Sequence, residues 1–155
     1  LPDEITRGLF SFAIEHKTGR LNSLDNFESN CVYKLDHVVI NTNDADGFIK
    51  VYEKDLGIRL ALDQTVEKWG GRMLFFRLNQ TTIEVIARSD EADSKDSLWG
   101  LAWDVENLEA THKRLTQLGI EASPVKEGRK SNTLVSTIKS NTCNIPTLFI
   151  QHLAS

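Results

Sequence analysis

Two ionisable side chains stand out because each interrupts an apolar, β-prone run. His37 alternates with Val38 and Ile40 and therefore points to the opposite face of its strand. Glu84 lies between Ile83 and Val85, where a carboxylate needs a partner or a raised pKa. An imidazole and a shielded carboxylate can exchange protons with a ligand or bind a metal ion. The plainer alternatives are a hydrogen-bonded lining residue for His37 and a structural salt bridge for Glu84.

Further candidates lie in extended or loop segments. Trp69 belongs to the segment 67–71, where an aromatic ring could cover an organic ligand or simply pack in a loop. Arginine pairs well with carboxylate or phosphate, and three arginines are candidates for an anionic ligand: Arg72, Arg77 and Arg129. If 79–80 is a two-residue turn, Arg77 shares the sheet face of Glu84, so an Arg77–Glu84 contact is a rival explanation for both.

The composition is that of a folded domain and excludes several classes of partner. The 155 residues are 40% hydrophobic and 26% charged, with a formal net charge of −4. Lys and Arg are scattered, so we expect no nucleic-acid partner. No run approaches the roughly 20 apolar residues of a membrane helix, and the start lacks an export signal, so we expect a cytoplasmic protein. The two cysteines, Cys31 and Cys143, are far apart and predict no disulfide framework.

An internal repeat positions these candidates. The runs 36–41 and 99–104 both read as strands, and each precedes a polar helix start, an apolar helical stripe and a Leu-Gly-Ile stop. Extended runs follow in both copies, at 72–78 and 82–87 and again at 133–138 and 146–153. The pattern predicts an α+β fold of two βαβββ modules, residues 33–90 and 98–155, joined by a solvated linker over 89–97.

Residues 1–32 fall outside both modules. The run 9–16 resembles the last strand of the chain, 146–152. Residues 1–16 are therefore interpreted either as the final strand of an earlier module whose other elements are absent, with 17–30 as linker, or as an added N-terminal edge strand. An unpaired edge could join another chain, so we expect a homodimer.

With both modules laid out, the chain resembles the vicinal oxygen chelate superfamily, which includes glyoxalases, bleomycin-resistance proteins and extradiol dioxygenases. The resemblance covers 33–155 and is carried by six segments: Leu35-Asp36-His37-Val38-Val39, Asp55-Leu56-Gly57, Thr82-Ile83-Glu84-Val85, Leu101-Ala102-Trp103-Asp104-Val105, Leu118-Gly119-Ile120 and Pro146 to Gln151. It implies that the paired modules form a mixed sheet curled into a cup.

The resemblance also implies a metal held by one residue from the first and last strands of each module. Those positions fall on His37, Glu84, Gly100 and Gln151. Gly100 supplies no ligand, and Gln151 replaces a carboxylate with an amide that cannot act as a base. The resemblance selects Gln151 over His152 as the residue that faces the cup. His37, Glu84 and Gln151 would form only a partial site, so a divalent ion is an alternative to the favoured cup without metal.

Three hypotheses follow. The leading one is a glyoxalase-like protein that binds a small organic molecule in a cup lined by His37, Glu84, Gln151 and aromatic side chains, with catalysis left open. The second is a metal-dependent lyase, isomerase or dioxygenase whose missing ligands come from a partner chain, from Glu15 or from an upstream module. The third is a structural or assembly module of a larger protein.

Overall fold

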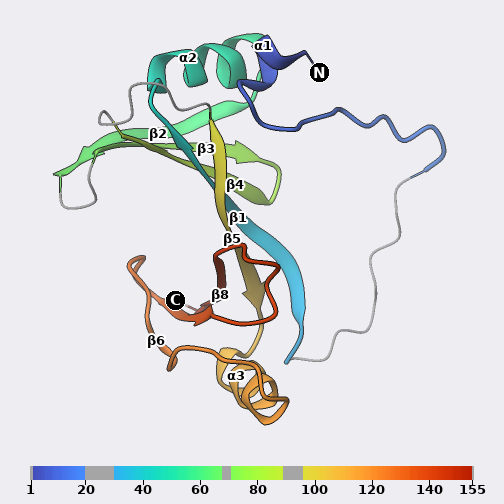
Figure 1. Ribbon diagram of the computed structural model, residues 1–155, viewed down its shortest axis with the longest axis vertical. Coiled ribbons are helices and arrows are strands. Elements are labelled where there is room, and N and C mark those ends of the chain that lie inside the picture. The colour runs from blue at the N-terminus through green and yellow to red at the C-terminus, as the bar shows by residue number, and fades with distance from the viewer. Residues whose placement is uncertain (1, 20–29, 68–70, 89–95, 155) are drawn as a thin grey trace.

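The computed structural model describes residues 2–19, 30–67, 71–88 and 96–154 (Figure 1). After a short helix α1 (Asp3–Thr6), the first module contains β1 (Val32–Thr42), α2 (Ala45–Ile49), the π-helical turn η1 (Lys50–Asp55), β2 (Arg59–Val66), β3 (Gly71–Leu78) and β4 (Thr81–Ala87). The second contains β5 (Ser97–Val105), α3 (Leu108–Gln117), β6 (Lys126–Glu127), β7 (Thr133–Ile138) and β8 (Thr147–His152).

The strands form one eight-stranded mixed sheet in the order β2-β3-β4-β1-β5-β8-β7-β6. The first strands of the modules, β1 and β5, are antiparallel neighbours at the centre. Each also pairs in parallel with the last strand of its own module, β1 with β4 and β5 with β8. Both halves therefore repeat one strand order about the β1–β5 pair, and the predicted α+β fold of paired modules in a curled sheet is confirmed.

The predicted helix boundaries match the structure. The side chains of Asp44 and Asn107 accept backbone N–H groups at the starts of α2 and α3. Gly57 and Gly119 follow the helical segments at φ 69° and 77°, a left-handed conformation that favours glycine. The turn of Asn79 and Gln80 also joins β3 to β4 as predicted.

The core of the first module lies between the sheet and the helical segment α2–η1. Phe48 and Tyr52, four residues apart, stack with their ring centroids 4.0 Å apart. They pack against β-strand side chains that share one face of the sheet: Ile40, Leu74, Phe76, Ile83 and Val85. We call this helix-bearing side the outer face. The alternate positions of the same strands, which include His37 and Glu84, form the inner face.

Asp96 was expected to be part of a solvated linker, and the structure corrects this. Its side chain is 1% exposed. It accepts hydrogen bonds from the guanidinium of Arg7 at 2.6 Å and from the hydroxyl of Thr42 at 2.7 Å. The Asp96 carboxylate therefore fastens the segment after α1 to the end of β1. Of the other residues of that expected linker, Ser97 is the first residue of β5, and 89–95 lie outside the described residues.

Residues 9–16 form no strand with the described parts of the chain, and they extend away from the sheet (Figure 1). The side chains of Phe10, Phe12 and Ile14 are 96%, 64% and 67% exposed. Glu15 pairs with Lys17 in this segment. The homodimer remains a prediction.

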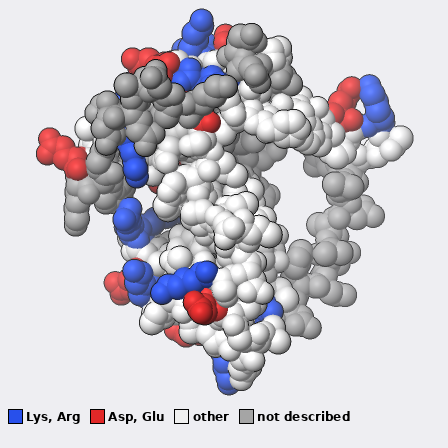
Figure 2. Space-filling view, viewed as in Figure 1, with Lys and Arg blue, Asp and Glu red and all other residues white. Residues whose placement is uncertain are grey.

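The surface charge is relevant to a nucleic-acid partner, and the length of the helices is relevant to a membrane. On the face shown in Figure 2, lysines and arginines are interspersed with acidic side chains and form no continuous basic stripe. Within the described parts of the chain, no helix is long and apolar enough to cross a membrane.

Replacing Asp96 with alanine removes the shared acceptor of Arg7 and Thr42. We expect the free energy of unfolding to fall by roughly 2 kcal/mol, the scale for hydrogen bonds to a charged group. Urea unfolding measures it. Glu15→Ala is the matched control, because its ion pair with Lys17 is exposed and contributes little. An unchanged stability in Asp96→Ala would contradict the anchoring role of this carboxylate.

Candidate acid-base site

The site begins with an irregularity in the central strand pair. Leu35 is paired with Trp103 and His37 with Ala102, so Asp36 is an extra residue opposite the β5 ladder. Such a β-bulge bends the strand and can turn two consecutive side chains to one face. The hydroxyl of Thr81 donates to the carbonyl oxygen of Leu35 at 3.0 Å and holds β1 just before the bulge. Asp36 and His37, neighbours in sequence, can therefore meet.

Asp36 contacts two imidazoles. Its Oδ2 lies 2.8 Å from Nδ1 of His37, and its Oδ1 lies 2.8 Å from Nε2 of His152. An ionised carboxylate only accepts, so both ring nitrogens donate. Burial by itself raises the pKa of Asp36, but the hydrogen bonds and charges of the two histidines outweigh it and hold that pKa well below its usual range. Asp36 is thus an anion that orients His37.

His37 faces Glu84 with its other ring nitrogen. Nε2 of His37 lies 3.9 Å from Oε2 of Glu84, and their side chains are 17% and 23% exposed. Burial raises the pKa of Glu84, while the charges of His37 and Arg129 oppose that shift. A carboxylate with a raised pKa beside an oriented imidazole is an arrangement suited to moving protons. Their partial exposure leaves both groups within reach of a ligand.

A second group of polar side chains continues along the inner face. Asp104, from β5, is 2% exposed and pairs with Nζ of Lys34 at 3.2 Å. Nε2 of His152 lies 3.9 Å from Oδ2 of the same carboxylate. Burial and the neighbouring Asp104 raise the pKa of Tyr33 to about 12. Acids and bases from β1, β5 and β8 therefore meet beside the His37–Glu84 pair.

The last strand presents the opposite residue from the one expected. The side-chain oxygen of Gln151 accepts a hydrogen bond from the backbone N–H of Leu108, at the start of α3, at 2.8 Å. Gln151 thus lies on the outer face, while His152, expected to be packing or surface, joins Asp36 on the inner face. The structure brings His37 and Glu84 together and does not bring Gln151 to them.

The remaining candidates are placed as follows. Trp69 lies outside the described residues. Arg77 lies opposite Thr82 as expected and donates to its hydroxyl. Arg72 is engaged by Asp46 and Asp63. The charge of Arg129 opposes the rise in the pKa of Glu84, so it acts at the site.

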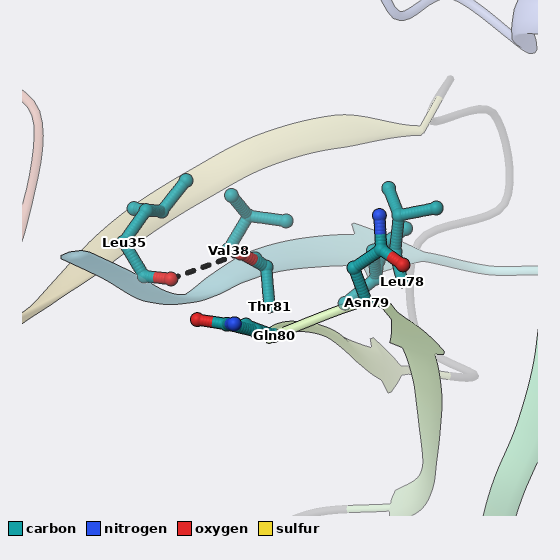
Figure 3. A pocket seen from close by; sticks show the side chains of 7 residues that line it. Leu35, Val38, Leu78, Asn79, Gln80 and Thr81 are labelled. Atoms are coloured by element: carbon teal, nitrogen blue, oxygen red, sulfur yellow. Dashed lines mark hydrogen bonds between the residues drawn. The ribbon is translucent and has the colours of Figure 1, made fainter. Parts of the chain in front are cut away.

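An open apolar groove lies elsewhere. It is lined by residues of β1 and of the β3–β4 hairpin, which are Leu35, Val38, Leu78, Asn79, Gln80, Thr81 and Ile83 (Figure 3). Val38 and Ile83 alternate with His37 and Glu84, so this groove opens on the outer face. It carries no acid–base group and is separate from the site.

Comparisons with known proteins place this geometry in a family. Residues 36–136 match the model of the glyoxalase/bleomycin resistance protein/dioxygenase superfamily. The chain belongs to this superfamily. A comparison with curated protein sequences gave no significant match.

Solved structures share the fold. Methylmalonyl-CoA epimerase from Mycobacterium tuberculosis is 21% identical with a TM-score of 0.67, over 84% of this chain and 95% of that one. A Streptomyces coelicolor methylmalonyl-CoA epimerase variant bound to 2-nitronate-propionyl-CoA is 15% identical with a TM-score of 0.64, over 80% and 100%. A hypothetical protein from Bacillus halodurans C-125 is 15% identical with a TM-score of 0.64, over 79% and 96%.

The metal site implied by the superfamily does not fit these residues. Gly100 has no side chain, and a Cβ there would lie 2.8 Å from the carbonyl oxygen of Pro146, too close for any other residue without a backbone shift. Gln151 is engaged with α3 on the outer face. His37 and Glu84 are left as two ligands, fewer than the superfamily's four positions would supply.

The raised pKa of Glu84 predicts a dependence of stability on pH. The folded protein binds the proton of the Glu84 carboxyl more tightly than the unfolded chain does. The contribution of Glu84 to the free energy of unfolding therefore falls as the pH rises from the usual carboxyl pKa through the raised value. Glu84→Gln cannot ionise. The free energy of unfolding of Glu84→Gln minus that of the wild type should therefore be larger at pH 7 than at pH 4. Urea unfolding at both pH values measures this difference.

Glu127→Gln, on the exposed strand β6, controls for the change in net charge. The same pH-dependent difference in both variants would show that burial of Glu84 is not its cause.

Proposed function

We propose that this protein moves a proton at a carbon atom next to a carbonyl group, the chemistry of an isomerase or epimerase. Glu84 removes the proton as the base, and His37 donates a hydrogen bond from Nε2 to the carbonyl oxygen as it becomes an enolate. Returning the proton to the same carbon, or to its neighbour, completes the reaction, so no oxidant and no other reactant is required.

The observation that carries this proposal is the His37–Glu84 pair. At 3.9 Å apart, the two groups are too close to enclose a carbon atom between them. Both groups can instead contact a substrate from the same side, because the carbon atom that bears the acidic hydrogen is only two bonds from the carbonyl oxygen. Asp36 accepts from Nδ1 of His37 at 2.8 Å and fixes the orientation of the ring, so that Nε2 is directed toward the substrate.

The substrate class is inferred from charge and from the fold. The positive charge of Arg129 reaches Glu84 and can neutralise a carboxylate on the substrate. Structures with the same fold include methylmalonyl-CoA epimerases, some of them bound to a nitronate analogue. We infer an acyl thioester or related carbonyl compound that bears a carboxylate and an acidic C–H.

Exchange of the substrate proton with D₂O tests this function. We expect the wild-type protein to incorporate one deuterium into methylmalonyl-CoA, followed by mass spectrometry. Glu84→Gln and His37→Gln should each reduce the rate by about 100-fold, the scale of a lost acid–base group. Glu127→Gln and His112→Gln are controls outside the site.

A nitronate analogue separates catalysis from binding. Tight binding of 2-nitronate-propionyl-CoA that weakens in His37→Gln, without any exchange, would assign the protein to ligand binding alone. Neither binding nor exchange, with this thioester or with a panel of carboxylated carbonyl compounds, would contradict the proposal.

A further inference from the structure

Three side chains on the inner face form a cluster that the proton-transfer pair does not use in full. The Asp36–Asp104–His152 cluster draws one residue each from β1, β5 and β8. One ligating atom of each lies within 4.8 Å of those of the others. Nε2 of His152 is 2.8 Å from Oδ1 of Asp36 and 3.9 Å from Oδ2 of Asp104. The three strands thus bring three metal-ligating atoms close to one another.

A second observation concerns the Asp104 carboxylate, of which one oxygen is unpartnered. The Asp104 side chain is 98% buried, and its Oδ1 has no hydrogen-bond partner among the described residues. An unpartnered, shielded carboxylate oxygen is costly, and in native proteins it commonly marks the place of a water or an ion. Carboxylate oxygens are common ligands of divalent cations, so a cation is a suitable occupant of this position.

We propose that the Asp36–Asp104–His152 cluster binds a divalent cation of the Zn²⁺ or Mn²⁺ kind. Two carboxylates and one imidazole suit such borderline ions, and ligands of a tetrahedral ion lie about 3.3 Å apart, within the range of separations seen here. Three protein ligands leave a coordination position open to water or substrate. This site shares no residue with the four superfamily positions at 37, 84, 100 and 151.

Asp36 can serve both sites at once. Its Oδ2 binds Nδ1 of His37, while its Oδ1 faces His152. A cation that replaces the proton between Asp36 and His152 would leave the His37 contact in place. The cation site therefore does not depend on the proposed proton transfer.

The ammonium group of Lys34 competes with the cation for the carboxylate of Asp104. Its Nζ lies 3.2 Å from Oδ2 of Asp104, the oxygen nearest His152. The Lys34 side chain is 29% exposed, and its flexible stem can turn the ammonium group out to solvent. An incoming ion must displace this ammonium group, so removing it should strengthen binding.

Titration of the metal-free full chain with Zn²⁺, followed by isothermal titration calorimetry, tests the site. We expect one ion per chain in the wild type. His152→Ala and Asp104→Asn should each weaken binding by at least about tenfold, as lost ligands do. Lys34→Ala should bind more tightly. Glu84→Gln is the matched control and should bind as wild type does.

Circular dichroism establishes that each variant is folded, and His152→Ala, at a partly exposed position, keeps the test open if Asp104→Asn is not. Zn²⁺ binding that persists in His152→Ala, or that is lost in Glu84→Gln, would overturn the proposal. So would no binding in the wild type. Calorimetry needs no turnover, so its result is separate from that of deuterium exchange.

Discussion

The carboxylate of Asp36 binds two imidazoles that lie 115 positions apart in the chain, and the inner face depends on that contact. One extra residue in β1 makes it possible. In a regular strand Asp36 and His37 would point to opposite faces, whereas the bulge opposite β5 turns them together. His152 arrives from the other module because β8 lies beside β5, next to β1. A local backbone irregularity thus links the two halves of the molecule through one side chain.

Two partly buried carboxylates on the inner face show that hydrogen-bond partners determine whether the pKa of the group is raised or lowered. Asp36 is shielded, but two hydrogen-bonded imidazoles more than offset the cost and lower its pKa. Glu84 is shielded with His37 only at 3.9 Å, and its pKa is raised. A carboxyl group is thus held as a fixed anion at one position and as a stronger base at the other.

The sequence predicted the parts of the fold that depend on local patterns. Alternation, helix caps and the glycine stops at Gly57 and Gly119 set the element order, while the superfamily resemblance implied that His37 and Glu84 share the inner face. A bulge leaves no mark in a single sequence, because Asp36 reads as an ordinary strand residue, so its contact with His37 was not predicted.

The choice between Gln151 and His152 rested on superfamily register rather than on local chemistry. The side-chain oxygen of Gln151 accepts a hydrogen bond from the backbone N–H of Leu108, the first residue of α3. Asp96 was missed because an acidic residue beside a charged run gives no sign that Arg7, far away in sequence, will bury it.

The most direct test is to observe the Nδ1 proton of His37 by NMR of ¹⁵N-histidine-labelled protein. The structure predicts a downfield, slowly exchanging proton on this nitrogen, which disappears in Asp36→Asn. If the spectrum of His37 were the same in both proteins, or if its Nδ1 carried no proton, Asp36 would not be holding this ring, and the arrangement described for the inner face would be wrong.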